Sequence, residues 1–187
     1  MKPYVITGGP GVGKTTTIEL LRQKGYAVVP EAARMIIEEE SLKGGEVLPW
    51  KSLPRFQQAV AQRQLRHEAA KHPEITFLDR SLVDGYAYCM LGKIPVPELV
   101  LNHGRNRYER VFLLERLEVY VTDQDRIEDE RLALAIHDEI RKAYAVFGYE
   151  PVSVPVLSPE ARVQFILDRI LEKKEVNVPS NPLSTTC

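Results

Sequence analysis

Apolar residues in this chain gather into short runs that are separated by longer stretches with a helical repeat. The first run, residues 4–6, ends at a glycine cluster, and the second ends at Pro30-Glu31. Short apolar runs bounded by glycine, proline or charged residues are typical of buried strands. The pattern therefore predicts five strands, at residues 4–6, 26–29, 75–79, 111–114 and 151–155.

The stretches between these runs carry apolar side chains at intervals of three or four, which places them on one face of a helix. The clearest case is the set Leu132, Ile136, Ile140 and Tyr144. Glycine and proline mark several of the boundaries. Helices are predicted at residues 15–24, 32–40, 55–71, 81–91, 98–106, 132–147 and 158–170.

Strands and helices alternate along the chain, and this order favours an α/β fold with a mainly parallel sheet covered by helices on both faces. Ligands of such sheets bind beyond the carboxyl ends of the strands. The glycine cluster, Glu31 and Asp79 each stand at the end of a predicted strand. We therefore expect these three positions to meet at one edge of the sheet.

The chain length of 187 residues suits one domain, and the composition is ordinary for a globular protein. We expect this domain to cover residues 1–173. The highly charged stretch at about residues 116–131 has no long apolar face and is expected to form a lid. Residues 174–187 contain prolines and serines and are expected to form a flexible tail.

Residues 8–15 match the phosphate-loop pattern G-x-x-x-x-G-K-[ST] at every position, between a predicted strand and a predicted helix. Glycines let the backbone curl so that its N–H groups point inward, and the helix adds its positive N-terminal end. A glycine turn without chemistry is the alternative, but a chance match in a chain of this length has odds on the order of one in two hundred. We predict that this loop binds ATP, with GTP not excluded. The expected contacts are Gly8, Gly9, Pro10, Gly11, Val12, Gly13, Lys14, Thr15 and Thr16.

Within this loop Lys14 is expected to reach the β- and γ-phosphates, and the Thr15 hydroxyl to bind Mg²⁺. Asp79 ends an apolar strand, a position from which a carboxylate can hold the same ion. Capping of the next helix is the alternative role for Asp79. The guanidinium of Arg80 is suited to clamp a phosphoryl group, with a surface ion pair as its alternative.

Glu31 follows the second predicted strand, where a carboxylate can accept the proton of an attacking hydroxyl. It can equally serve as a helix-terminal acid favoured by the helix dipole. Arg34, one turn later, is a candidate contact to the substrate.

Arg126 and Arg131 lie five residues apart in the charged stretch that is expected to form the lid. Such stretches are usually solvated helix starts. Phosphoryl transfer, however, gains from cations that close over the developing charge and expel water. Both arginines are therefore candidate catalytic residues.

Other features of the chain narrow the possible functions. The net charge of −1 gives no general attraction to nucleic acid or anionic membranes. No apolar stretch is long enough to span a membrane. Two cysteines and no secretory leader favour a cytoplasmic protein with reduced thiols, and the four histidines have no metal-like spacing. The oligomeric state stays open.

Four segments, residues 7–16, 30–34, 77–80 and 125–128, together resemble the AAA-type ATPase domain family related to nicotinamide riboside kinase domains. The resemblance extends over about residues 3–172. It implies a P-loop NTPase fold of three layers, with a five-stranded parallel sheet in the order 2-3-1-4-5 and a lid after the fourth strand. Nucleoside and nucleotide kinases have a similar architecture.

The resemblance also implies roles for individual residues. Asp79-Arg80-Ser81 is similar to the acid-Arg-Ser motif of deoxynucleoside kinases, in which the acid serves Mg²⁺ and the arginine serves the phosphates. Glu31 matches the position of their proposed base, although Ala32 stands where those enzymes have proline.

The leading functional hypothesis is an ATP- and Mg²⁺-dependent kinase that phosphorylates a small, nucleoside-like metabolite. The alternative is a nucleotide-binding switch or scaffold with slow hydrolysis that acts through a partner or an anionic lipid. A motor-type ATPase is disfavoured because Arg80 stands where such proteins commonly carry a second acid. The guanine-reading Asn-Lys-x-Asp pattern is absent, which disfavours an ordinary GTPase switch.

Overall fold

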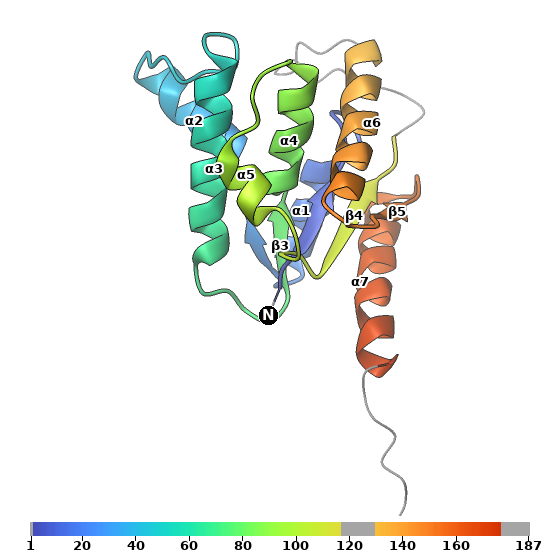
Figure 1. The fold of residues 1–187 in the computed structure, drawn as a ribbon. Coiled ribbons are helices and arrows are strands. Elements are labelled where there is room, and N and C mark those ends of the chain that lie inside the picture. Colours follow the sequence, from blue (N-terminus) through green and yellow to red (C-terminus); the bar gives the residue numbers. More distant parts are fainter. Residues whose placement is uncertain (1, 117–129, 177–187) are drawn as a thin grey trace, which may run out of the picture.

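A computed structural model of the chain describes residues 2–116 and 130–176, and Figure 1 shows its elements. The strands are β1 (Tyr4–Thr7), β2 (Ala27–Val29), β3 (Thr76–Asp79), β4 (Arg110–Leu114) and β5 (Val152–Val154). The helices are α1 (Lys14–Gln23), α2 (Ala32–Leu42), α3 (Leu53–Ala69), α4 (Leu82–Leu91), α5 (Glu98–His103), α6 (Glu130–Val146) and α7 (Pro159–Val176).

The five strands form one parallel sheet in the order β2-β3-β1-β4-β5. Strand β1 lies at the centre, where Val5 is paired with Leu78 on one side and with Val111 on the other. The α/β fold, its parallel sheet and its strand order are confirmed. Because all strands run in the same direction, the ends of β1, β2 and β3 share one edge of the sheet.

Alternate residues of the strands enter two separate hydrophobic cores, one on each face of the sheet. Val5 and Leu78 pack with residues of α3, α4 and α6 on one face. Ile6 and Phe77 pack with residues of α1 and α7 on the other. Figure 1 shows α3, α4 and α6 side by side on the first face. Full burial of each large side chain contributes about 1.5–3 kcal/mol, so the two cores hold the helices firmly against the sheet.

The predicted boundaries differ from the observed ones by a few residues. Helix α3 begins earlier, at Leu53, because Pro54 is compatible with the first turn of a helix. Helix α7 continues to Val176, three residues into the predicted tail, through good helix formers such as Lys173 and Lys174.

Most of the predicted lid, residues 117–129, lies outside the described residues, as does the tail from residue 177. The last two residues of the predicted lid, Glu130 and Arg131, form the first turn of α6. None of the helices in the described ranges is long and apolar enough to cross a membrane.

Candidate phosphate-binding and catalytic site

The predicted phosphate loop connects the end of β1 with the start of α1, as its mechanism requires. Gly8 has φ of 139°, a conformation that side chains rarely allow. A Cβ atom at Gly8 would also lie 2.9 Å from the carbonyl oxygen of Leu114, the last residue of β4. Glycine is therefore required here both by the backbone conformation and by the close approach of β4.

Lys14, the first residue of α1, is buried with 3% of its surface exposed. Its Nζ donates hydrogen bonds to the carbonyl oxygens of Gly8, at 2.9 Å, and Gly9, at 2.6 Å. The ammonium group thus lies over the loop that it is predicted to serve. Thr15 and Thr16 follow in the first turn of α1 and are exposed, so their hydroxyls are open to a ligand.

Glu31 and Arg80 form an ion pair between the ends of β2 and β3. Glu31 Oε1 lies 3.0 Å from Arg80 Nε, although the angle is not that of a hydrogen bond. Both side chains are largely buried. Glu31 occupies the N-cap position of α2, but its side chain accepts no capping hydrogen bond from the backbone of that helix. The ion pair of Arg80 with Glu31 is largely buried and is therefore not a surface ion pair.

Arg80 also contacts Asp84 and Tyr88 of α4. Its Nη1 donates to Asp84 Oδ1 at 3.2 Å, and its guanidinium carbon lies 5.4 Å from the centre of the Tyr88 ring. The backbone of Arg80 has φ of 66°, an unusual value for a residue with a side chain. Such local strain persists only where surrounding contacts fix the residue, and the buried pairs of Arg80 do so here.

Asp79 lies at the end of β3, and its Oδ1 atom is buried without a hydrogen-bond partner among the described residues. Burial, and next the negative charge of Glu31, raise the pKa of Asp79, and its net value is about 6. The positive charges of Lys14, Arg80 and Arg34 oppose this effect. Asp79 does not cap α4, because Ser81 is the cap of that helix.

The arginines predicted for the site differ in where they lie. Arg34 is exposed in the first turn of α2, close enough to Asp79 to influence its pKa. Arg131 is exposed in the first turn of α6, and no contact among the described residues joins it to the other candidates. Arg126 lies outside the described residues.

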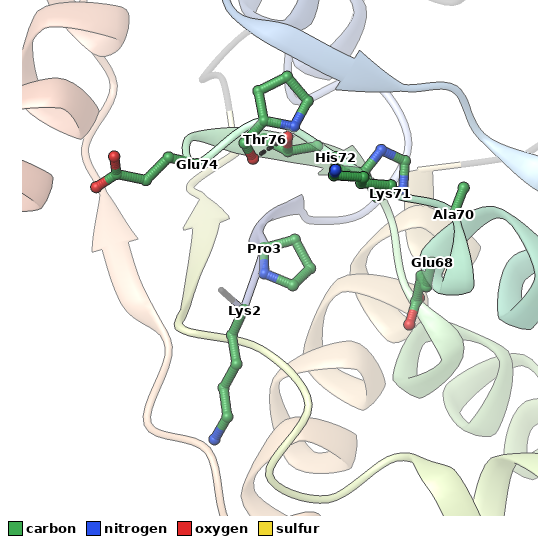
Figure 2. A pocket seen from close by; sticks show the side chains of 9 residues that line it. Lys2, Pro3, Glu68, Ala70, Lys71, His72, Glu74 and Thr76 are labelled. Atoms are coloured by element: carbon green, nitrogen blue, oxygen red, sulfur yellow. Dashed lines mark hydrogen bonds between the residues drawn. The ribbon is translucent and has the colours of Figure 1, made fainter.

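One concavity of the described surface lies away from this edge of the sheet. A pocket of about 320 Å³ lies at the opposite edge, beside the starts of β1 and β3, and includes Lys2, His72 and Thr76. In Figure 2 the side chains of Lys2 and Glu74 extend in different directions and do not converge on one centre. We therefore locate the site by its chemistry, at the edge where the phosphate loop lies.

Comparison with protein families fits this geometry. Residues 3–162 match the model of a family described as an AAA domain. The chain belongs to the AAA domain family.

Solved structures similar to this AAA domain include the NadR protein and two small-molecule kinases, all at low sequence identity. The NadR protein in complex with NR has a TM-score of 0.68 at 18% identity, over 98% of this chain and 53% of its own. Shikimate kinase from Acinetobacter baumannii has a TM-score of 0.61 at 16% identity, over 93% and 95% of the two chains. Deoxyadenosine kinase from M. mycoides has a TM-score of 0.56 at 15% identity, over 91% and 99%.

The AAA domain described here spans about half the length of the NadR chains. At these identities the likeness concerns the fold alone. No curated protein matches the chain in sequence.

The residues of this AAA domain fit a bound Mg²⁺ ion. The buried Oδ1 of Asp79 has no hydrogen-bond partner among the described residues, and a hard cation with a preference for carboxylate and hydroxyl oxygens would fit beside it. Such an ion would also lower the raised pKa of Asp79. The exposed hydroxyl of Thr15 is a second candidate ligand.

Sequence reasoning missed Asp84, which organises this site in the AAA domain. The buried carboxylate accepts hydrogen bonds from Thr7 Oγ1, from the backbone of Ser81 at 2.9 Å and from Tyr144 at 2.6 Å, besides its contact with Arg80. Its signal was the capping-box pattern Ser81-x-x-Asp84, which the structure contains in full.

His137 and Arg162 were also missed. Both are buried beside the phosphate loop, His137 in α6 and Arg162 in α7. Arg162 stands four residues before the buried Ile166 and therefore on the same, inward face of the helix. A charged residue at such an apolar position was the sequence signal that could have identified Arg162.

Proposed function

We propose that this AAA domain is an ATP- and Mg²⁺-dependent phosphotransferase that acts on a hydroxyl group of a small, nucleoside-like metabolite. The observation that carries the proposal is the meeting of three kinds of group at one sheet edge. These are the buried Lys14 on a complete phosphate loop, Asp79 with its unpartnered Oδ1 atom, and the Glu31–Arg80 pair. A loop that only bound nucleotide would need Lys14 and Asp79 but would not need the Glu31–Arg80 pair.

The donor side of the site consists of the phosphate loop and two oxygen ligands. Lys14 and the loop amides hold the β- and γ-phosphates of ATP. Thr15 and Asp79 hold Mg²⁺, which neutralises the charge that develops on the phosphates when it is bound. Lys14 releases its two carbonyl partners, Gly8 and Gly9, when it turns to a phosphate.

On the acceptor side, Glu31 accepts the proton of the attacking hydroxyl. Arg80 fixes the direction of the Glu31 carboxylate through their ion pair and presents its remaining N–H groups to phosphoryl oxygens. Arg34, exposed one turn along α2, is placed to contact the acceptor. Arg126 and Arg131 are proposed to add positive charge over the transferred group.

Proteins with the same fold support a kinase in preference to a motor. The similar structures include a deoxyadenosine kinase and a shikimate kinase, and the NadR protein was solved with NR. Small hydroxyl-bearing acceptors are therefore the first class to test.

The direct test is ADP release from Mg·ATP by the purified chain, with and without a panel of nucleosides, pyridine ribosides and other small alcohols. We expect at least one compound to stimulate ADP release and to gain 80 Da, the mass of one phosphoryl group replacing a proton, by mass spectrometry. Glu31→Gln keeps the size of the side chain and removes its basicity. It is expected to lower the stimulated rate by about 10²- to 10⁴-fold and to leave ATP affinity unchanged.

Two outcomes contradict this proposal. An unchanged rate in Glu31→Gln removes Glu31 as the base. If no acceptor stimulates turnover while ATP changes the binding of a partner protein or anionic vesicles, the chain is a nucleotide-dependent switch and not a kinase.

A further inference from the structure

The phosphate loop is held from the side by helix α6. The backbone N–H of Gly9 donates a hydrogen bond of 3.2 Å to Nδ1 of His137. A Cβ atom at Gly9 would lie 3.0 Å from the carbonyl oxygen of Ala133 and 3.0 Å from the Cβ of His137. Gly9 therefore lets α6 approach the loop closely enough for an imidazole to reach its backbone.

This hydrogen bond fixes the protonation of the imidazole. A backbone N–H can only donate, so Nδ1 must carry a lone pair, and in a neutral ring the proton is then on Nε2. Nε2 lies 3.5 Å from Glu115 Oε2, an acceptor for that proton. Arg141 Nη2 also approaches Nε2, at 3.4 Å, but its shorter bond of 2.9 Å goes to Glu115.

Glu115, the residue after β4, connects this imidazole to the rest of the fold. Its carboxylate accepts bonds from Arg141 and from Ser153 Oγ, the latter at 2.7 Å, and its backbone N–H donates to Val154 O at 2.9 Å. Glu115 is thus anchored to both α6 and β5, and so its carboxylate can hold the His137 ring in place.

The second connection from Glu115 reaches the other end of the loop. Its carbonyl oxygen accepts a bond of 3.1 Å from Arg162 Nη2, and Nη1 of the same guanidinium donates to Val12 O. The loop is therefore held at Gly9 through His137 and at Val12 through Arg162. The first of these two connections requires a neutral side chain, whereas the second does not.

The surroundings of His137 favour its neutral form. The residue is 3% exposed, and burial lowers the pKa of its imidazole below the ordinary value of 6.5. Among the charged groups that face it, Glu115 from the end of β4 and Asp138 from α6 raise the pKa, while Arg141 from α6 lowers it. The balance keeps the imidazole able to accept the Gly9 bond at neutral pH.

We propose that His137 is a positioning residue for nucleotide binding: its unprotonated Nδ1 holds the Gly9 amide and so keeps the phosphate loop in its binding conformation. This proposal rests on the nucleotide-binding part of the proposed function. Protonation turns Nδ1 from a hydrogen-bond acceptor into a donor. It then faces the N–H of Gly9, which is also a donor, and the hydrogen bond between them is lost. Part of the pH dependence of nucleotide affinity therefore comes from the protonation of His137.

The test measures the dissociation constant of Mg·ATP by calorimetry between pH 5 and pH 8 for four proteins. These are the wild type, His137→Ala, His137→Asn and His103→Asn. Asparagine places its Oδ1 near the position of Nδ1 and accepts the same bond at every pH. His103, at the end of α5, is exposed and serves as the matched control.

At pH 7.5 we expect His137→Ala to bind Mg·ATP about three- to tenfold more weakly than the wild type, the worth of one backbone hydrogen bond. His137→Asn is expected to bind within a factor of two of the wild type. As the pH is lowered, the dissociation constant of the wild type should rise relative to that of His137→Asn, because only the wild type loses the hydrogen bond to Gly9. The titrations of ATP and of Asp79 are common to both proteins and cancel in the ratio of the two constants. His103→Asn should follow the wild type throughout.

A second measurement is independent of nucleotide. The ¹⁵N–¹H NMR spectrum of the histidine side chains in the free protein should show, at pH 7.5, a neutral His137 with its proton on Nε2. A proton on Nδ1 at this pH overturns the proposal.

Equal Mg·ATP affinity in wild type, His137→Ala and His137→Asn at all pH values also overturns the positioning role while leaving the proposed function intact. If the wild type itself fails to bind Mg·ATP, the proposed function fails and this inference fails with it. Thermal unfolding of each variant establishes that the proteins compared are folded.

Discussion

The carboxylate of Asp79, whose Oδ1 atom is buried, leads to a prediction in which stability and function have opposite requirements. Its pKa of about 6, against 3.8 for an ordinary aspartate, means that the folded chain disfavours the charged form. The shift corresponds to about 3 kcal/mol. Asp79→Asn removes the charge and keeps the shape. We expect it to raise the free energy of unfolding of the ligand-free protein by about 1–3 kcal/mol at pH 7.5, since the amide still needs partners of its own.

The dependence on pH follows from the sign of the shift. Between about pH 4 and pH 6 the folded chain binds more protons at Asp79 than the unfolded chain does, so the wild type loses stability as pH rises through this window. Above it the penalty is constant. At pH 4 Asp79 is largely protonated in the folded state, and most of the difference between wild type and Asp79→Asn disappears.

Thermal and urea unfolding at pH 7.5 and pH 4 measure this effect. For a chain of this size the gain corresponds to a rise in Tm of about 2–12 °C at pH 7.5. Asp168→Asn, which removes an exposed carboxylate from α7, is the matched control and should change stability by less than about 0.5 kcal/mol. Addition of Mg·ATP should stabilise the wild type and not Asp79→Asn. A destabilised Asp79→Asn, or a gain that is the same at both pH values, refutes the reasoning.

Two further substitutions test the parts that support the site. Gly8→Ala places a Cβ atom 2.9 Å from Leu114 O in an unfavourable backbone conformation and should cost about 1–3 kcal/mol and abolish ATP binding. Gly44→Ala, with φ of 64° and open space around it, also places alanine at a positive φ, at a smaller conformational cost, and should leave ATP binding intact in calorimetry. Asp84→Ala leaves Arg80 and three other donors without their acceptor, and urea unfolding should show a loss of about 3–5 kcal/mol. A loss below 1 kcal/mol contradicts the central role of this carboxylate.

Much of this fold could be predicted because its signals are local. The apolar runs gave the strands, and the glycine pattern with Lys14 located the phosphate loop between a strand and a helix. Glu31 and Asp79 could be placed at one edge because parallel strands end together. The structure shows these residues close enough for Glu31 to influence the pKa of Asp79.

The residues that hold the site in place could not be derived in the same way. His137 contacts Gly9 across 128 positions of sequence, and Arg162 contacts Val12 across 150. Such contacts depend on how helices pack on the sheet, and a single sequence does not encode them in its local pattern. Asp84 is intermediate, because its capping-box spacing was visible while its bond to Tyr144 of α6 was not.

The central claim is that the phosphate loop and Lys14 bind the triphosphate of a nucleotide together with Mg²⁺. Calorimetric titration of Mg·ATP into wild type, Lys14→Ala and Lys24→Ala tests it most directly, since Lys24 is an exposed lysine that follows the same helix. The account predicts a heat of binding in the wild type and in Lys24→Ala that is lost in Lys14→Ala, with all three proteins folded. Absence of binding in the folded wild type, or equal binding in all three, would contradict it.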